Sequence, residues 1–249
     1  MRYIAIIPAR FESTRFPGKP LALIKNKPII QWVYENVTKA VEHTYVATDD
    51  DRIFNAVRDF GGNAIKTQAV HHSGTDRIAE AALKLAGKLQ FDVVINIQGD
   101  EPFIIKEQID LLKSCFENDT EIATLVKKID SEEELFNPNR PKVVIDNDMN
   151  ALYFSRSIIP FIRNMDKSDW VKHHNYWSHI GMYAYKKDVL QAITHLKQSN
   201  LELAESLEQL RWIENGFKIK VAETTHQSIG IDTPNDLEIA ISFLNSTAK

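Results

Sequence analysis

The chain has 249 residues, and with 43% hydrophobic residues it can bury a core without disulfide or metal staples. Its formal net charge of −4 argues against a general nucleic-acid-binding protein, which would be basic. The single cysteine, Cys115, excludes an internal disulfide and a cysteine zinc cluster, and we expect it to be a small buried helix residue. No apolar run approaches the roughly 18 residues of a membrane helix, and the run at 3–7 is too short for a signal peptide. These features together predict a soluble, folded, cytoplasmic protein.

Short apolar, β-branched runs alternate with longer amphipathic stretches in the first hundred residues. Strands are expected at 3–7, 44–47, 64–66 and 92–97, and helices at 28–40, 51–60 and 75–89. Gly61-Gly62 is a typical helix stop. The alternation predicts right-handed crossovers and a Rossmann-like, mostly parallel sheet covered by helices on both faces.

The pattern changes after a helix expected at 106–116. The next expected strands are 122–128, 142–146, 151–155 and 179–185, which favours an antiparallel section. The remaining elements are a helix at 201–215, strands at 218–222 and 228–231, and a helix at 234–244. We predict one α/β domain over 1–249, in which about 120–200 form an inserted, partly antiparallel lobe.

A basic loop follows the first expected strand. Residues 1–28 contain six basic side chains and one acidic side chain, Glu12, on an otherwise acidic protein. In an open parallel sheet, ligands bind outside the carboxyl ends of the strands, and a cationic loop there suits a polyphosphate. Ser13 and Pro20 exclude a Walker A motif, and the dinucleotide-binding G-x-G-x-x-G is also missing. The loop therefore favours phosphate binding over simple solvation.

Two carboxylates follow apolar strands that are far apart in the sequence. Asp100 comes directly after a buried run, and Asp232 ends a shorter one. Mg²⁺ is commonly bound through one or two carboxylates together with substrate phosphates, so these two could share one metal. The alternative is that they cap helices beginning near Pro102 and at Pro234. The sequence leaves both interpretations open.

The segment His72-Ser73-Gly74-Thr75-Asp76-Arg77 opens the third expected helix. Its backbone N–H groups and Arg77 could hold an anion or the edge of a base. It is also typical of a capping box, with Ser73 as the N-cap and Asp76 three residues later. The two interpretations are compatible.

Near the end of the chain, the expected helix at 201–215 places Leu203, Leu207 and Leu210 on one face, which is the spacing of a core-facing stripe. Glu208 and Gln209 lie off this stripe, where they can reach a ligand or face solvent.

Nine segments carry a resemblance to a known family. They are IPARFESTRFPGKPL, VATDD, HSGTDR, NIQGDEP, FNPN, ALYFSR, HIGMYAY, LEQLRWIENG and IDTPNDLE, and they cover nearly the whole chain. Single motifs are shared with other sugar nucleotidyltransferases, but the set in this order closely resembles the CMP-Kdo synthetases, in which Kdo is 3-deoxy-manno-octulosonate. The resemblance implies the nucleotide-diphospho-sugar-transferase fold.

The resemblance also implies an activity. CTP and Kdo would give CMP-Kdo and diphosphate with Mg²⁺ as cofactor, in a cytoplasmic homodimer that supplies lipopolysaccharide assembly. The anomeric hydroxyl would attack the α-phosphate in line, so catalysis would consist mostly of positioning and electrostatics. The sequence contains no evident nucleophile–base arrangement, as this chemistry allows.

Site residues follow from the family's pattern. Lys19, Asp100 and Asp232 would be catalytic, with Asp100 and Asp232 as the Mg²⁺ ligands. The nucleotide site would comprise Ala9, Arg10, Arg15, Lys19, Ser73, Arg77 and Asp100. The sugar-acid site would comprise Gln98, Arg156, Arg163, His179, Tyr183, Glu208 and Gln209. A sugar carboxylate calls for arginine, although an ordinary ion pair would explain Arg156 and Arg163 equally well without the resemblance.

Three other functions are compatible with parts of the sequence. The same chemistry could act on 8-amino-3,8-dideoxy-manno-octulosonate or another acidic sugar such as a sialic acid. A catalytically inactive nucleotide- or sugar-binding protein is disfavoured because Lys19, Asp100 and Asp232 are all present. An NAD-dependent dehydrogenase is disfavoured because the G-x-G-x-x-G motif is missing.

Overall fold

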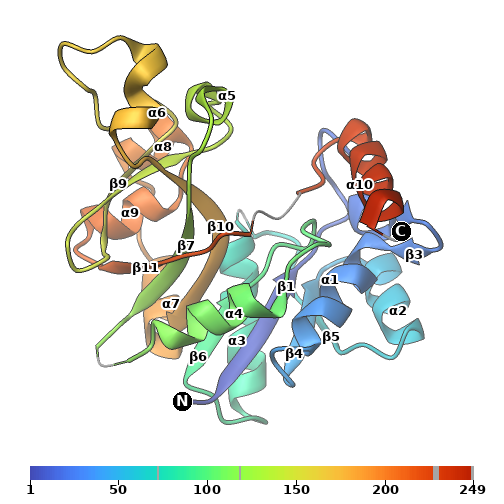
Figure 1. Cartoon of the computed structure of the whole chain (residues 1–249). Helices are drawn as coiled ribbons and strands as arrows, with labels where there is room; N and C mark the ends of the chain where they lie inside the picture. Colours follow the sequence, from blue (N-terminus) through green and yellow to red (C-terminus); the bar gives the residue numbers. More distant parts are fainter. Residues whose placement is uncertain (72, 118, 227–229, 248–249) are drawn as a thin grey trace. The chain divides into compact units, whose positions relative to one another are not determined.

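The structure is a computed structural model that describes residues 1–71, 73–117, 119–226 and 230–247 (Figure 1). The chain forms two units, the first consisting of Met1–Asp110 and Ser228–Lys249. The second, Leu111–Gln227, is inserted in the chain of the first. The expected lobe at about 120–200 lies within the second unit, and the action of the whole chain as one domain stays a prediction.

The first unit contains the expected parallel sheet, in the strand order β6-β1-β4-β5. Its strands are β1 (Tyr3–Pro8), β4 (Thr44–Thr48), β5 (Ala64–Lys66) and β6 (Val93–Asn96). The four central residues of β1 are fully buried, because the sheet is covered on both faces. A small hairpin, β2 (Leu23–Ile24) and β3 (Lys27–Pro28), stands apart from this sheet.

Helices of the first unit connect these strands in the expected order. They are η1 (Lys19–Leu21), α1 (Ile29–Thr38), α2 (Asp51–Asp59), α3 (Gly74–Ala86) and, near the C-terminus, α10 (Pro234–Thr247). Right-handed crossovers place α1 and α2 on one face and α3 on the other, since the strand order reverses direction between β5 and β6 (Figure 1). Helix α4 (Lys106–Ser114) runs across the boundary between the units.

The second unit contains the expected antiparallel section. Its strands are β7 (Ile122–Lys128), β8 (Lys142–Ile145), β9 (Ala151–Ser155), β10 (Trp177–Lys186) and β11 (Ile219–Glu223). Within the unit they pair in the order β11-β7-β10-β8-β9, and every pair is antiparallel except β11–β7. The mixture of a parallel and a largely antiparallel part matches the expected α/β class.

Short helices of the second unit were harder to predict. They are α5 (Glu132–Phe136), η2 (Lys167–Asp169), α6 (Trp170–His173), α7 (Lys187–Thr194), α8 (Asn200–Glu205) and α9 (Gln209–Glu214). No helix was expected from the sequence at α5, η2, α6 or α7. Among the residues described here, no helix is long and apolar enough to cross a membrane.

The single helix expected at 201–215 is wrong. The chain forms α8 and α9 instead, because Ser206 between them adopts the left-handed conformation with φ 52°. Of the expected apolar stripe, Leu207 and Leu210 are buried, whereas Leu203 is 59% exposed. A local break therefore overrides the helical spacing of the sequence.

Two smaller expectations, for Cys115 and for a strand at 228–231, differ from the structure. Cys115 is buried as expected but lies just after the end of α4, and burial raises the pKa of its thiol to about 11. The strand expected at 228–231 falls partly outside the described residues, and Gly230 and Ile231 are not in a strand.

Candidate active site

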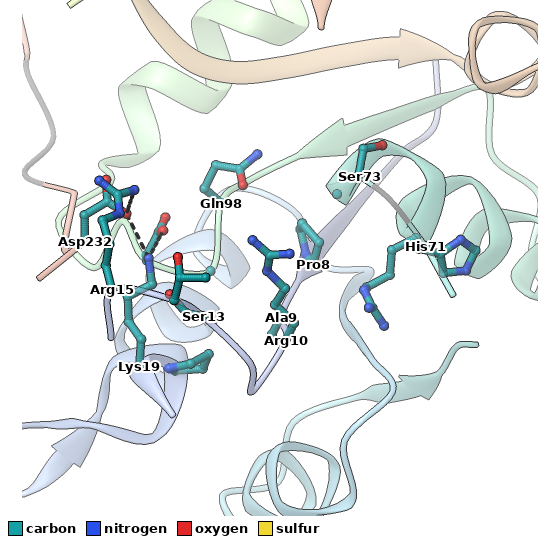
Figure 2. A pocket seen from close by; sticks show the side chains of 16 residues that line it. Pro8, Ala9, Arg10, Ser13, Arg15, Lys19, His71, Ser73, Gln98 and Asp232 are labelled. Atoms are coloured by element: carbon teal, nitrogen blue, oxygen red, sulfur yellow. Dashed lines mark hydrogen bonds and ion pairs between the residues drawn. The ribbon is translucent and has the colours of Figure 1, made fainter. Parts of the chain in front are cut away.

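The strand order of the first unit changes direction at β1. Strands β4 and β5 lie on one side of β1, and β6 lies on the other. Such a switch point leaves a crevice at the carboxyl ends of the strands, where open α/β sheets bind ligands. A cavity of about 270 Å³ is lined there by residues that follow β1 and β6, by the start of α3 and by Asp232 (Figure 2).

The basic loop after β1 is closed by Phe11 and Gly18. The Gly18 N–H donates to the Phe11 carbonyl at 2.8 Å. Gly18 has φ +72°, and a Cβ at this position would lie 3.0 Å from the Phe11 ring, so the turn requires glycine. The Arg52 guanidinium lies over the Phe11 ring, 3.2 Å from its centroid. The loop is therefore held from its base while Arg10 and Arg15 line the cavity.

Lys19 joins the two aspartates that were expected to hold the metal. Its Nζ donates to Asp100 and also lies 3.1 Å from Asp232 Oδ1. Arg15 Nη2 contacts the same Asp232 oxygen at 3.1 Å. The Ile231 N–H donates to the Asp100 carbonyl at 2.9 Å, and this backbone bond brings the two distant aspartates side by side. The first unit thus gathers two carboxylates and two cations at one end of the cavity (Figure 2).

The capping interpretation is wrong for both aspartates. No helix begins near Pro102 in the described chain, since α4 begins at Lys106. At α10, Thr233 and Asp236 exchange the capping bonds, with the Thr233 N–H donating to Asp236 Oδ2 at 2.8 Å. Neither Asp100 nor Asp232 therefore caps the start of a helix with its side chain.

Gly99 brings the ends of β1 and β6 together. A Cβ at Gly99 would lie 2.9 Å from the Pro8 carbonyl oxygen, so no larger residue fits without a shift. Ala9, which follows Pro8, also lines the cavity, and its N–H donates to the Ala47 carbonyl at 2.9 Å. Gln98, expected at the sugar acid, lines the same cavity as these nucleotide-side residues.

Ser73 and His71 lie at the end of the cavity away from Lys19, with Arg10 between the two ends (Figure 2). Ser73 forms the expected capping box with Asp76, so that prediction is confirmed.

His71, which directly precedes the HSGTDR motif, was expected only to lie in a loop and was given no site role. Its Nε2 bonds to the Glu80 carboxylate on α3, and the residue lines the cavity. Burial acts to raise the pKa of Glu80, but hydrogen bonds from Lys84 and His71 outweigh it and lower that pKa to about 2.

Asp100 and Asp232 suit a magnesium ion better than a metal that takes all of its ligands from protein side chains. Among the described residues, no group of three or more His, Cys, Asp or Glu side chains is arranged to hold a metal ion. Asp100 and Asp232 supply oxygen donors of the kind that Mg²⁺ prefers, and Mg²⁺ usually keeps waters and takes phosphate oxygens as well. The donor set therefore suits a metal that arrives with a polyphosphate.

In the second unit, the Arg156 guanidinium is bound by backbone carbonyls. It donates to Glu205 O at 2.7 Å, Pro138 O at 3.1 Å and Ser206 O at 3.4 Å. Glu205 and Ser206 end α8, so Arg156 caps this helix. The alternative of an ordinary ion pair for Arg156 is therefore wrong, because its guanidinium contacts backbone carbonyls. Arg163 is exposed and makes no hydrogen bond with another described residue.

His179 and Tyr183 lie on β10, on either side of a register shift against β7. Their ring centroids are 5.2 Å apart, and His179 Nε2 lies 3.1 Å from Thr124 Oγ1. Burial lowers the pKa of His179 to about 3 and raises the pKa of the Tyr183 phenol well above its usual value. Both groups are therefore neutral near pH 7 and can exchange hydrogen bonds, but not charge, with a ligand.

Glu208 and Gln209 lie where α9 begins. Glu208 Oε1 accepts a hydrogen bond from Arg211 Nη2 at 2.6 Å. Gln209 is buried, and its Nε2 has no hydrogen-bond partner among the described residues. Solvent exposure, one of the two alternatives for Gln209, is therefore wrong. A buried amide without a protein partner calls for a water molecule or a ligand atom as its acceptor.

The expected site residues of the first unit thus form one group, whereas only some of those in the second unit lie together. The first unit brings together Ala9, Arg10, Arg15, Lys19, Ser73, Arg77, Gln98, Asp100 and Asp232 around one cavity. The second unit brings His179 and Tyr183 into contact, and Tyr183 packs on Trp212 of α9 at 5.2 Å between ring centroids. It does not bring Arg156 and Arg163 into a described contact with this pair.

The chain matches the family model described as cytidylyltransferase over residues 4–220. The protein named 3-deoxy-manno-octulosonate cytidylyltransferase from Bacteroides thetaiotaomicron is 57% identical over 250 residues, which cover 99% of each chain. The protein of the same name from Phocaeicola vulgatus is 58% identical over 248 residues, or 98% of each chain.

A solved structure described as CMP:2-keto-3-deoxy-manno-octonic acid synthetase complexed with CTP has a TM-score of 0.91 and 41% identity. The match covers 99% of this chain and 100% of that one, so it confirms the expected nucleotidyltransferase fold. The switch-point cavity, the motifs around it and these matches lead to one assignment. The chain belongs to the cytidylyltransferase family, among the 3-deoxy-manno-octulosonate cytidylyltransferases.

Proposed function

We propose that this chain activates Kdo by joining it to CMP: CTP and 3-deoxy-manno-octulosonate give CMP-Kdo and diphosphate. The product would serve lipopolysaccharide assembly, and the enzyme would act as a homodimer in the bacterial cytoplasm. The names of the 57% and 58% identical relatives support the choice of Kdo as the acidic sugar.

The observation that carries the proposal is the junction of Lys19 with Asp100 and Asp232. A polyphosphate needs cations, and a divalent metal needs carboxylates. In the cavity of about 270 Å³, this junction supplies the cation and the two carboxylates next to one another. Lys19, with a side chain only 12% exposed, is held in place before any ligand arrives.

The reaction forms one bond and breaks one. The anomeric hydroxyl oxygen of the sugar bonds to the α-phosphorus, the bond from that phosphorus to the β-phosphate side breaks, and the hydroxyl proton passes to solvent. Arg10 and Lys19 hold the phosphates and neutralise charge on the leaving diphosphate. Holding both substrates in register can supply roughly 7–11 kcal/mol of the barrier.

Asp100 and Asp232 are the residues that would hold Mg²⁺. When bound, Mg²⁺ would withdraw charge from the phosphate oxygens and make the attacking hydroxyl more acidic. Lys19 and Arg15, which contact these carboxylates, can then turn to the phosphates. His179, Tyr183 and Gln209 supply neutral hydrogen-bonding groups for the hydroxyls of the sugar acid.

Diphosphate release tests the proposal directly. The purified chain is mixed with CTP, Mg²⁺ and one of three sugars: Kdo, its 8-amino analogue or a sialic acid. We expect release with Kdo, loss of release with EDTA, and a product of the mass of CMP-Kdo. Release with only another sugar would overturn the choice of Kdo. Silence with every sugar, from folded protein that binds CTP, would overturn the activity.

A matched pair of lysine variants ties the activity to the cavity. Lys19→Met should lower kcat/KM by about 100-fold, since it removes a cation from the phosphate site. Lys25→Met is the control, because Lys25 is exposed in the same stretch and does not line the cavity. Equal activity of the two variants would contradict the phosphate role of Lys19.

A further inference from the structure

Three consecutive acids follow β4, and each has a different partner. Asp49 forms an ion pair with Arg77 on α3, with 2.7 Å between Oδ1 and Nη1 but without the alignment of a hydrogen bond. Asp50 caps α2 by accepting from the Arg52 and Ile53 N–H groups. Asp51 is 83% exposed and pairs with Lys66 at 2.7 Å. The first acid alone of the three is directed at a residue of the cavity wall.

The Arg77 guanidinium is nearly buried, with 6% of its side chain exposed, and it lines the cavity. All of its described contacts fall on Nη1, which donates to Thr67 Oγ1 at 2.6 Å and approaches the Gln68 carbonyl at 3.4 Å in addition to Asp49. Nε and Nη2 have no hydrogen-bond partner among the described residues. One end of the fork is thus anchored, and the other donors are available to a ligand.

A buried guanidinium needs a negative partner to offset its lost hydration. Within the described chain, Asp49 is the acid that pairs with Arg77, and the other two contacts are neutral oxygens. Without Asp49, Arg77 would keep only its contacts with Thr67 Oγ1 and the Gln68 carbonyl, and its long side chain would be held less firmly. The ligand would then have to order it on binding, at a cost in affinity.

The backbone of Asp49 is itself held. Lys66 Nζ donates to the Asp49 carbonyl at 2.7 Å, which links the ends of β4 and β5. The backbone that carries the Asp49 carboxylate is therefore fixed in position. Asp49 is not among the residues that line the cavity. Any effect of Asp49 on a ligand there has to pass through Arg77.

We propose that Asp49 is a positioning residue for nucleotide binding: it fixes Arg77 so that the free donors of the guanidinium face the nucleotide. This inference rests on the proposed function, since it takes CTP as the ligand of the cavity. It predicts that Asp49 governs the affinity for CTP and not the chemical step or the affinity for the sugar.

The test compares Asp49→Asn with Asp51→Asn. Titration calorimetry gives the Kd for CTP, steady-state kinetics give kcat and both KM values, and thermal unfolding monitors the fold. For Asp49→Asn we expect the Kd and KM for CTP to rise about tenfold, with kcat and the sugar KM within about twofold of wild type. Asp51→Asn should match wild type, and Asp49→Glu should recover part of the CTP affinity.

A double-variant cycle isolates the route through Arg77. If Asp49 acts through Arg77, Asp49→Asn should add nothing to the loss caused by Arg77→Lys. Additive losses, or an unchanged CTP affinity in folded Asp49→Asn, would overturn the inference. If Asp49→Asn fails to fold, Asp49→Glu and the Arg77→Lys cycle made with it carry the same test.

The two proposals fail in distinguishable ways. Wild-type protein that does not bind CTP would sink the proposed function and this inference together. Wild-type protein that binds CTP, with Asp49→Asn binding equally well, would sink only the role of Asp49.

Discussion

The two units use their charged side chains in different ways. In the first unit, Lys19 and Arg15 contact the carboxylates of Asp100 and Asp232 through ion pairs that border an open cavity. In the second unit, Arg156 is bound by the carbonyls that end α8. A ligand can replace the first kind of contact without unravelling any element. It cannot replace the second kind without uncapping a helix.

This difference separates function from stability. Substitutions among the cavity residues of the first unit should damage catalysis and leave folding nearly intact. Substitutions of Arg156, His179 and Tyr183 in the second unit should cost both, because Arg156 caps α8 and the two rings pack against each other on β10.

Asp100→Asn should lower kcat by roughly 100- to 1000-fold, because it removes one of the two carboxylates expected to hold the metal. Its melting temperature should stay close to that of wild type. Ser131→Ala provides the control for a lost helix cap away from the cavity. Ser131 caps α5 by accepting from the Glu134 N–H, so its loss should lower stability by about 1 kcal/mol and leave kcat unchanged. A folded Asp100→Asn enzyme with wild-type turnover would break the comparison at its strongest point.

Arg156→Met should destabilise the chain by about 1–3 kcal/mol, since three carbonyls lose a charged donor. It should also raise the KM for the sugar acid and leave the KM for CTP unchanged. Denaturant unfolding measures the first effect, and initial rates at varied substrate measure the second. A variant with normal stability and a raised sugar KM would show that the guanidinium leaves α8 to bind the ligand, which would contradict the structural role.

Gly18→Ala and Gly216→Ala compare two left-handed glycines, one in each unit. Both have φ near +80°, but a Cβ at Gly18 meets the Phe11 ring at 3.0 Å, whereas none of the described atoms lies within 4 Å at Gly216. Each alanine carries a backbone strain of about 1 kcal/mol. Only Gly18→Ala should also disturb the basic loop and raise the KM for CTP several-fold. Equal CTP kinetics in the two variants would remove the loop from the nucleotide site.

The first unit was the easier one to predict from sequence. Strands β1 and β6 are buried on both faces and therefore read as continuous apolar runs, and the carboxyl end of β1 could be assigned a ligand loop from topology alone. Spacing alone could not predict the meeting of Asp100 and Asp232, which only the family resemblance implied, because it depends on the Ile231–Asp100 backbone bond between distant segments. Neither His71 nor Asp49 could be given a site role from the sequence for the same reason, since their partners lie on α3.

In the second unit, the strands were predicted well from the sequence, and the helices between them were predicted poorly. The break between α8 and α9 needs Ser206 in a left-handed conformation, and its carbonyl is held by Arg156, 50 residues away. Nothing local in LEQLRWIENG signals this contact. The burial of Gln209 followed from the same break, since it moved the residue off the helix face that the spacing had assigned.

His179 offers the most delicate test of the contrast, through pH. Its pKa is about 3 in the folded chain against about 6.5 for a free histidine, because burial disfavours the charged ring. Between these two values the unfolded chain binds more protons than the folded one, so stability falls as the pH drops from about 6.5 toward 3. His179→Gln should show a shallower fall over this range, and denaturant unfolding at pH 7 and at lower pH would measure the difference. Parallel curves of stability against pH for the variant and wild type would mean that the imidazole is hydrated in the folded chain. The polar groups of the second unit would then be as accessible to water as those of the first, and the contrast between the units would fail.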